Sequence, residues 1–298
     1  MQGPQPLAAW LVQKPYHAVL GLALTLLLPF AQILTGAAMT VIVLALGLGK
    51  ALSLGAMAAA VVGVMSVITG ADVVTILANA ALFWLPAALV AGLLRRTRSL
   101  PLTLQVTAIV ALAGTLLTHI VLADPVAFWK AQLAAMSVAF MKMGFEQQAN
   151  LLLAQQDILA PQMTVLFVLT TWSLIALVLA LGYWVFQSLP EQAARFGRFC
   201  DLNFGRILAI VTIVAAVLAV VSGVNWLQNL ALVGFAMFWV QGLALLHWLR
   251  VEGPLPFVAL IVVYGLLPVL NVLLMAGLAA LGYSDAWLNY RARARRNP

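Results

Sequence analysis

Residues 163–186 read MTVLFVLTTWSLIALVLALGYWVF, a run without a single formal charge. A helix needs about 20 predominantly apolar residues to cross the hydrocarbon core of a bilayer, so this run by itself predicts a transmembrane helix. A longer uncharged run covers Tyr16–Gly49 when His17 is counted as neutral. Its 34 residues would extend about 51 Å as one helix, which predicts two short helices with a break near Pro29–Gly36.

The whole chain shares the character of these two runs. Of its 298 residues, 65% are apolar and 8% are charged, and the mean hydropathy is +1.09. Soluble domains are roughly 45–50% apolar and about 25% charged, which excludes a soluble enzyme or a nucleic-acid-binding domain. The single cysteine, Cys200, excludes a disulfide scaffold. The long unbroken runs exclude a β-barrel, whose strands alternate in segments of about 10 residues.

The expected fold is all-α, a polytopic transmembrane helical bundle of about eight or nine membrane segments, some short or broken. Residues 1–298 are expected to form a single integral membrane domain. Gly70-Ala71-Asp72 predicts a turn, with Asp72 as the N-cap of the helix that follows. Beyond Tyr16–Gly49, the predicted segments are Ala51–Thr69, Val73–Leu94, Leu100–Leu122, Met163–Phe186, Ile207–Ser222, Leu227–Trp248 and an interrupted stretch, Leu255–Leu281.

The basic residues predict the orientation and the location. The net charge is +7, and most arginines fall in three clusters, Arg95/Arg96/Arg98, Arg195/Arg198/Arg206 and Arg291/Arg293/Arg295/Arg296. Because short cytoplasmic loops carry Lys and Arg, we expect a multi-pass membrane protein with these clusters on the cytoplasmic side. Residues 188–206 would be a short cytoplasmic helix or loop, opening with a Ser188–Glu191 capping box. Residues 283–298 would be a basic cytoplasmic tail. The expected partner is the lipid bilayer, with no nucleic acid.

The last apolar stretch conflicts with this orientation. Counting forward from a cytoplasmic Arg95, a single crossing by Leu255–Leu281 would leave the basic tail outside. The stretch could bend at Gly265–Pro268 and return to its own side, form two short tilted helices, or leave the tail outside. Its 27 residues extend about 40 Å as a helix, too short for two comfortable crossings. We favour a broken or re-entrant hairpin with the tail in the cytoplasm.

Residues 123–160 differ from the rest of the chain. Asp124-Pro125 has the form of an N-cap followed by a proline at the first helical position. Apolar side chains then recur at helical spacing, at Trp129, Leu133, Met136, Phe140 and Met143. This pattern predicts an amphipathic, extracytoplasmic helical insertion, either an interfacial helix or a lid over the bundle.

No motif in the sequence indicates catalysis. The three histidines lie in separate segments, and H-E-x-x-H, phosphate-binding glycine loops and G-x-S-x-G are absent. No carboxylate lies near the middle of a predicted span, which argues against proton-coupled transport. We therefore expect no enzyme activity, no metal site and no cofactor.

Neutral amides followed by tryptophans form the candidate ligand site. Such a pair suits an uncharged or zwitterionic small molecule, and interhelical hydrogen bonding is the alternative. The candidate ligand-binding residues are Asn79, Trp84, His119, Gln241 and Asn271. Small residues also recur every fourth position at Gly55, Ala59 and Gly63. They predict close helix packing or a docking face for a partner membrane protein.

The C-terminal sequence Leu281-Gly-Tyr-Ser-Asp-Ala-Trp-Leu-Asn-Tyr-Arg291 closes an apolar stretch that contains Pro268. This ending resembles the YybS-like family, bacterial polytopic membrane proteins of unknown function, and the general plan is similar along most of the chain. The family is remotely similar to the S components of energy-coupling-factor transporters, which bind a vitamin and depend on a separate transmembrane subunit and ATPases. This chain has more spans than those components and no vitamin-specific motif. The resemblance rests on Gly282, Asp285 and Arg291, which would end the helix at the interface, with Asp285 and Arg291 paired.

Two functions remain open from the sequence. One is small-solute binding or transport, S-component-like and without an energy module of its own, with a transporter subunit as a partner. The other is a structural or assembly protein that docks partner proteins through its basic loops and small-residue helix face. A pocket around Trp84, Gln241 and Asn271 would favour the first function, and a fully packed core would favour the second.

Overall fold

The computed structural model describes residues 5–28, 30–189 and 196–294, with only the backbone of Gln5, Pro6 and Asn271. This described part of the chain contains fourteen α-helices and no strand. The predicted all-α class is therefore confirmed. Most of the described helices follow one another through short turns, as expected for a chain whose apolar runs lie close together. The longer connection lies between Phe186 at the end of α10 and Gly205 at the start of α11.

Six helices in the described ranges are long and apolar enough to cross a membrane. That number is smaller than the eight or nine predicted segments. The difference arises because α3 (Ala31–Leu46) and the two apolar parts of α13 (Phe257–Leu288) are shorter than about 20 residues. The six are α4 (Leu48–Thr69), α5 (Val73–Thr97), α6 (Leu100–Val121), α10 (Met163–Phe186) with α9 (Gln156–Leu159) before it, α11 (Gly205–Ser222) and α12 (Asn225–Glu252).

Contacts divide the chain into two compact units where the sequence suggested a single domain. The first unit comprises Met1–Leu104 and Ser173–Arg198, and the second comprises Gln105–Trp172 and Phe199–Pro298. The boundaries fall within α6 and α10, so each of these helices contributes to both units. Each unit has its own core and is described by itself.

The first unit contains α1 (Gln5–Gln13), α2 (Pro15–Thr25), α3, α4, α5 and the second half of α10. The predicted helix break lies between α2 and α3, where Phe30 has a positive φ of 60°. Arg95 joins α5 to the end of α3, because its Nη1 donates to the carbonyls of Val43 and Leu44 at 3.0 and 2.7 Å. The Val43 carbonyl also accepts from the N–H of Gly47 at 2.9 Å. A cation at the C-terminal end of a helix interacts favourably with the carbonyls there.

Asp72 caps α5, as the sequence predicts. Its Oδ1 accepts a hydrogen bond from the backbone N–H of Val74 at 3.0 Å, and its Oδ2 accepts one from the Thr75 hydroxyl. The bond from Thr75, followed by the backbone bonds, lowers the pKa of this exposed carboxyl below its ordinary value of 3.8. Because the folded state favours the carboxylate, the cap is intact at neutral pH and is lost only as the pH falls through that lowered pKa.

Helix α12 is the centre of the second unit. Of its most apolar stretch, 67% is buried, against 22–33% for the other five candidate spans. Helices α11 and α13 pack on it. Polar side chains on the buried part of a helix must bond to protein partners, and α12 places Asn229 and Gln241 in this way.

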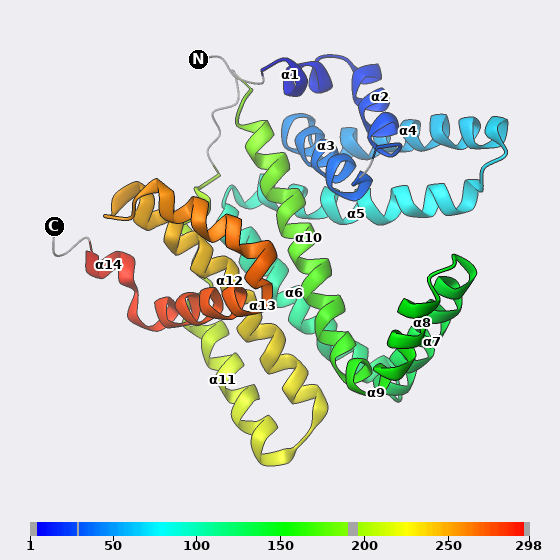
Figure 1. Ribbon diagram of the computed structural model, residues 1–298. Helices are drawn as coiled ribbons and strands as arrows, with labels where there is room; N and C mark the ends of the chain where they lie inside the picture. The colour runs from blue at the N-terminus through cyan, green and yellow to red at the C-terminus, as the bar shows by residue number, and fades with distance from the viewer. Residues whose placement is uncertain (1–4, 29, 190–195, 295–298) are drawn as a thin grey trace. The chain divides into compact units, whose positions relative to one another are not determined.

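Helix α13 bends strongly between Tyr264 and Leu278, but it is one continuous helix without the break expected near Gly265–Pro268. Tyr264 hydrogen bonds His247 of α12 at 2.8 Å, whereas Leu278 lies against Gly242. In a straight helix, Tyr264 and Leu278 would lie about 21 Å apart along the axis. The residues that they contact on α12, His247 and Gly242, are only about 7.5 Å apart along that helix, so α13 must bend between them. The ribbon accordingly changes direction between its orange and red parts (Figure 1). Backbone helix nevertheless continues through Pro268.

Gly282 does not end a helix, contrary to the role implied by the family resemblance, because α13 continues to Leu288. It lies instead where α12 and α13 touch backbone to backbone. A Cβ at Gly282 would overlap the carbonyl of Phe238 and the N–H of Gly242, and a Cβ at Gly242 would overlap the carbonyl of Leu278. Only glycine allows this approach.

Residues 123–160 form a helical hairpin and not one amphipathic helix. It consists of α7 (Pro125–Lys142), α8 (Glu146–Ala154) and α9, followed by a 3₁₀ turn, Ala160–Gln162. The predicted cap is present, since Asp124 Oδ1 accepts from the N–H groups of Val126 and Ala127. The predicted apolar stripe is only partly used. Leu133 is buried, but Met136 and Met143 are exposed, because α8 covers one narrow face of α7.

The segment 188–206 was expected to be a short helix or loop, and its described part contains a 3₁₀ turn, Phe199–Asp201. Glu191 of the expected capping box and Arg195 lie outside the described residues. The short α14 (Tyr290–Ala294) follows α13.

Substitution of Gly282 by alanine should destabilise the protein by about 1–3 kcal/mol, because the new methyl group must push two backbones apart. Gly277 is the matched control on the same helix, since a Cβ there would meet no described atom within 4 Å. Gly277→Ala should be neutral or slightly stabilising, because alanine is the better helix former. Thermal unfolding in detergent measures both variants. Equal shifts would contradict the close contact.

Candidate ligand pocket and buried polar network

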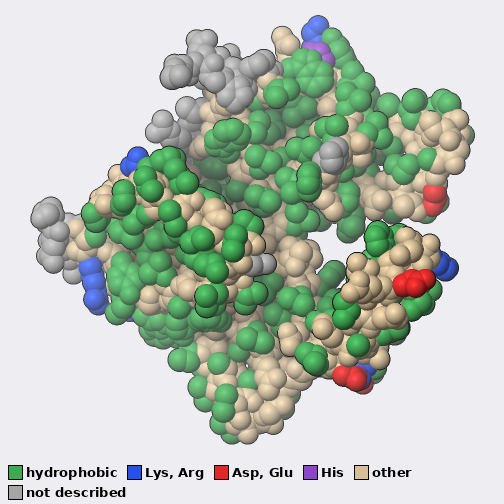
Figure 2. All heavy atoms as spheres, in the orientation of Figure 1, with side chains coloured by type: hydrophobic (Ala, Val, Ile, Leu, Met, Phe, Trp, Pro, Cys, Tyr) green, Lys and Arg blue, Asp and Glu red, His purple; other side chains and the backbone are tan. Residues whose placement is uncertain are grey.

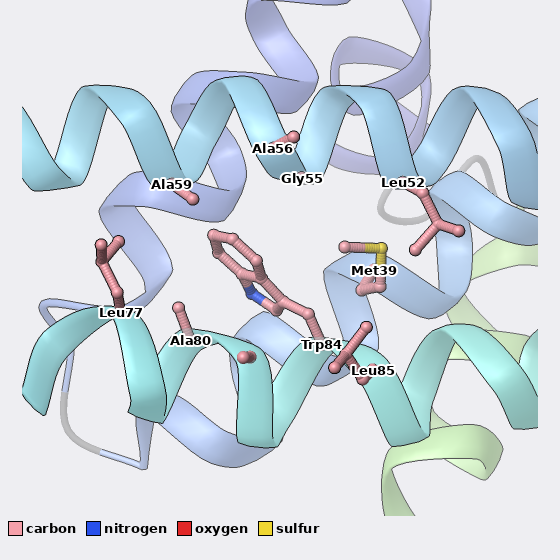
Figure 3. Close-up of a pocket in the computed structure, with 10 residues that line it drawn as sticks. Met39, Leu52, Gly55, Ala56, Ala59, Leu77, Ala80, Trp84 and Leu85 are labelled. Carbon is pink, nitrogen blue, oxygen red and sulfur yellow. The ribbon is translucent and has the colours of Figure 1, made fainter. Parts of the chain in front are cut away.

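A cavity of about 300 Å³ lies between α4 and α5. Its volume is at the lower end of the range for small-molecule sites. No charged side chain is among the lining residues that the structure describes. They are Met39 from α3, Leu52, Gly55, Ala56 and Ala59 from α4, and Leu77, Ala80, Ala81, Trp84 and Leu85 from α5 (Figure 3).

Small residues on α4 create this space. The indole of Trp84 lies between the two helices, facing Gly55 and Ala59 (Figure 3). A Cβ at Gly55 would meet Met39 at 3.0 Å and Trp84 at 3.7 Å, so a larger residue there would fill part of the cavity. The predicted small-residue face and the predicted aromatic residue therefore belong to one site. Gly63 lies farther along α4, where an added Cβ would lie 3.9 Å from Leu77.

The single donor of Trp84 is used inside the protein. Its Nε1 donates to the hydroxyl of Thr35 at 2.6 Å, in a buried position. Asn79, the amide predicted to act with Trp84, is exposed and does not line the cavity, because five residues along a helix place two side chains on different faces. The cavity thus suits an apolar ligand and not the zwitterion that the sequence allowed.

Gln241 lies in the other unit, within a buried polar network. Its Nε2 donates to Asp285 Oδ2 at 2.9 Å, and its Oε1 accepts from the N–H of Phe204 at 2.7 Å. Arg291 Nη1 lies 3.3 Å from the same Asp285 oxygen, which confirms the expected pairing. The N–H of Tyr290 donates to the second oxygen at 3.1 Å. Asp285 has no exposed surface.

This network joins α12, α13, α14 and the loop before α11, so its role in the fold is structural. Both ends of the Gln241 amide are bonded to protein groups, and the interhelical alternative for this residue is the one the structure supports. A polar depression of about 320 Å³ lies beside Arg291, lined also by Asp201, Asn203, Asn289 and Ala292.

His119 also serves a helix contact. The amide of Asn229 on α12 lies 3.3 Å from its Nε2, and the carbonyl of Thr115 lies 2.9 Å from its Nδ1. An amide N–H facing Nε2 makes that nitrogen the acceptor, so the proton is on Nδ1. The side chain of the last candidate, Asn271, lies outside the described residues.

Within the described ranges, no group of three or more His, Cys, Asp or Glu residues is close enough to hold a metal ion. No family model, curated protein or solved structure matches the chain.

Asp285→Asn should destabilise the protein by about 3–5 kcal/mol, because Arg291 loses the charge of its buried partner. A matched control is Lys130→Gln, which breaks the exposed Lys130–Asp157 pair, 2.6 Å long, and should cost less than about 1 kcal/mol. Unfolding titrations in detergent give both free energies. A small effect of Asp285→Asn would show that the network does not hold the helix ends.

Proposed function

We propose that this chain is an integral protein of the bacterial cytoplasmic membrane that binds a small apolar molecule from the lipid phase. The observation that carries the proposal is the uncharged cavity between α4 and α5. The role is solute binding related to transport, without an energy module of its own, and its partner is a separate transporter subunit.

Membrane insertion follows from the surfaces of the helices. The outer faces of α4 and α5 expose large apolar side chains, among them Val67, Ile68, Leu82 and Leu89. On the face shown in Figure 2, apolar side chains cover wide areas and charged groups are few. Water disfavours such a surface, whereas hydrocarbon tolerates it. If α3 and the two apolar parts of α13 enter the bilayer with the six full-length candidates, the protein has nine membrane segments and a cytoplasmic C-terminal tail.

The cavity lies near the middle of the hydrocarbon layer in this arrangement. Trp84 is eleven residues from the start of α5 at Val73, about 17 Å along the axis, and the hydrocarbon core is about 30 Å thick. Acyl chains of the bilayer and hydrophobic molecules dissolved among them reach this depth. A ligand can therefore enter from the side, without passing through water.

The chemistry of the walls selects an apolar ligand. A buried charge or an unpaired polar group costs several kcal/mol, and the described walls offer neither a countercharge nor an unused indole donor. The apolar ligand is inferred from these residues alone. The transport-related role, the bacterial membrane and the transporter subunit come from the resemblance to the YybS-like family, which no family model supports.

The experiment fills the cavity. Ala59→Phe places a ring between α4 and α5, and Ala60→Phe is the matched control, since Ala60 is exposed and does not line the cavity. A photoactivatable uncharged hydrocarbon is incubated with each purified protein, and the labelled peptides are identified by mass spectrometry. We expect labelling of α4 and α5 in the native protein and in Ala60→Phe.

The affinity of Ala59→Phe should fall about tenfold or more, because each excluded methylene forfeits about 0.8 kcal/mol. Equal labelling in both variants would overturn the proposal. Absence of labelling in the native protein, with a second protein cross-linked at the same helices, would instead establish the assembly function.

A further inference from the structure

The turn that joins α7 and α8 exposes an apolar cluster that the proposed function does not use. Met141, Met143 and Phe145 are 42%, 68% and 52% exposed. Gly144, with a φ of 84°, reverses the chain between them, and Lys142 and Glu146 flank them. We call residues 141–146 the hairpin tip. We propose that the hairpin tip inserts its apolar side chains into the boundary between headgroups and acyl chains of the bilayer.

The hairpin holds the tip in a defined position. Ser137 of α7 donates to the carbonyl of Ala149 on α8 at 3.2 Å, and Lys130 pairs with Asp157 at 2.6 Å. At the base, Trp129 Nε1 donates to the hydroxyl of Thr164 on α10 at 2.8 Å. These bonds fasten α7 to α8, to α9 and to α10, so the tip is presented by a braced element.

The connections of the hairpin keep it next to the membrane. α7 begins at Pro125, four residues after α6 ends at Val121, and the 3₁₀ turn Ala160–Gln162 leads directly into α10. Both α6 and α10 are candidate spans, but α7 is not among them. In Figure 1 the hairpin turns back from the ends of α6 and α10 and does not continue along their axes. The tip is about 20 Å from Trp129 along α7, within reach of the bilayer surface.

The composition of the tip fits a lipid surface better than a protein partner. Three partly exposed side chains offer on the order of 300 Å², well below the roughly 800 Å² that each partner contributes to a stable protein interface. A few apolar side chains beside charged ones suit an interfacial element, whose apolar part sinks about 5–10 Å below the headgroups. Lys142 can then extend its ammonium toward the phosphates.

Spin labels test this placement in the full chain, reconstituted in vesicles of phosphatidylcholine and phosphatidylglycerol. Met143→Cys reports the tip, and Gln132→Cys is the matched control on α7, exposed but closer to the base. Both cysteine variants also carry Cys200→Ser, so that the spin label reacts at one position only. If Cys200→Ser impairs folding, the buried native Cys200 is kept. Accessibility is measured to oxygen, which concentrates in lipid, and to an aqueous nickel chelate.

We expect the label at position 143 to be several-fold more accessible to oxygen and several-fold less accessible to the nickel chelate than the label at position 132. High nickel accessibility at position 143 would place the tip in water and overturn the proposal. Low accessibility to both reagents would show that protein covers it, a partner or a second copy, and would overturn it equally.

The inference rests on the proposed membrane insertion of α6 and α10. A third spin label distinguishes failure of the inference from failure of that proposed insertion. Ile109→Cys lies on the exposed apolar face of α6 and should show the lipid pattern if α6 crosses the bilayer. A lipid pattern at position 109 without one at position 143 refutes the hairpin tip alone. A water pattern at position 109 refutes the membrane arrangement itself.

Discussion

Backbone polar groups that cannot reach water must bond to each other, and in a chain that is 65% apolar the described helices meet this constraint. This constraint makes the described chain helical. It also requires partners for the N–H and C=O groups that each helix leaves unpaired at its ends. Asp72 and Asp124 supply acceptors at helix starts, and Arg95 supplies donors to the last carbonyls of α3. The few charged residues are thus concentrated where helices end. Asp285 extends the same principle, since a buried carboxylate there accepts from the chain beyond α13.

Small residues have two opposite consequences in the two units. Between α12 and α13, Gly242 and Gly282 let backbones touch, and the contact leaves no room even for a methyl group. Between α4 and α5, Gly55 and Ala59 face the rigid indole of Trp84, which holds the helices apart and leaves a cavity. The difference lies in what opposes the small residue, because a stiff aromatic ring cannot collapse into the space as another glycine does.

The helical spacing of the sequence carries information about the cavity that is lost when candidate residues are considered one at a time. Its walls follow helical spacing, at Leu52, Gly55, Ala56 and Ala59 on one helix and at Leu77, Ala80, Ala81 and Trp84 on the next. Pairing those two faces across the Asp72 turn would have located it. No sequence pattern predicts the hydrogen bond from Trp84 to Thr35, because 49 residues separate the two. Gln241 shows the converse, since a mid-helix amide looks the same in sequence whether it binds a ligand or another helix.

Composition, run length and local motifs by themselves determined the helical class, most helix limits and the caps at Asp72 and Asp124, because these depend on local hydrogen bonds and on hydropathy over about 20 residues. The pairing of Asp285 with Arg291 was expected only from the resemblance at the C-terminal sequence. Only the tertiary structure decided the division into two units, the folding of residues 123–160 into a hairpin and the apolar nature of the cavity. Each of those depends on which faces meet, and in a chain that is 65% apolar nearly every face is apolar, so hydropathy cannot choose between them.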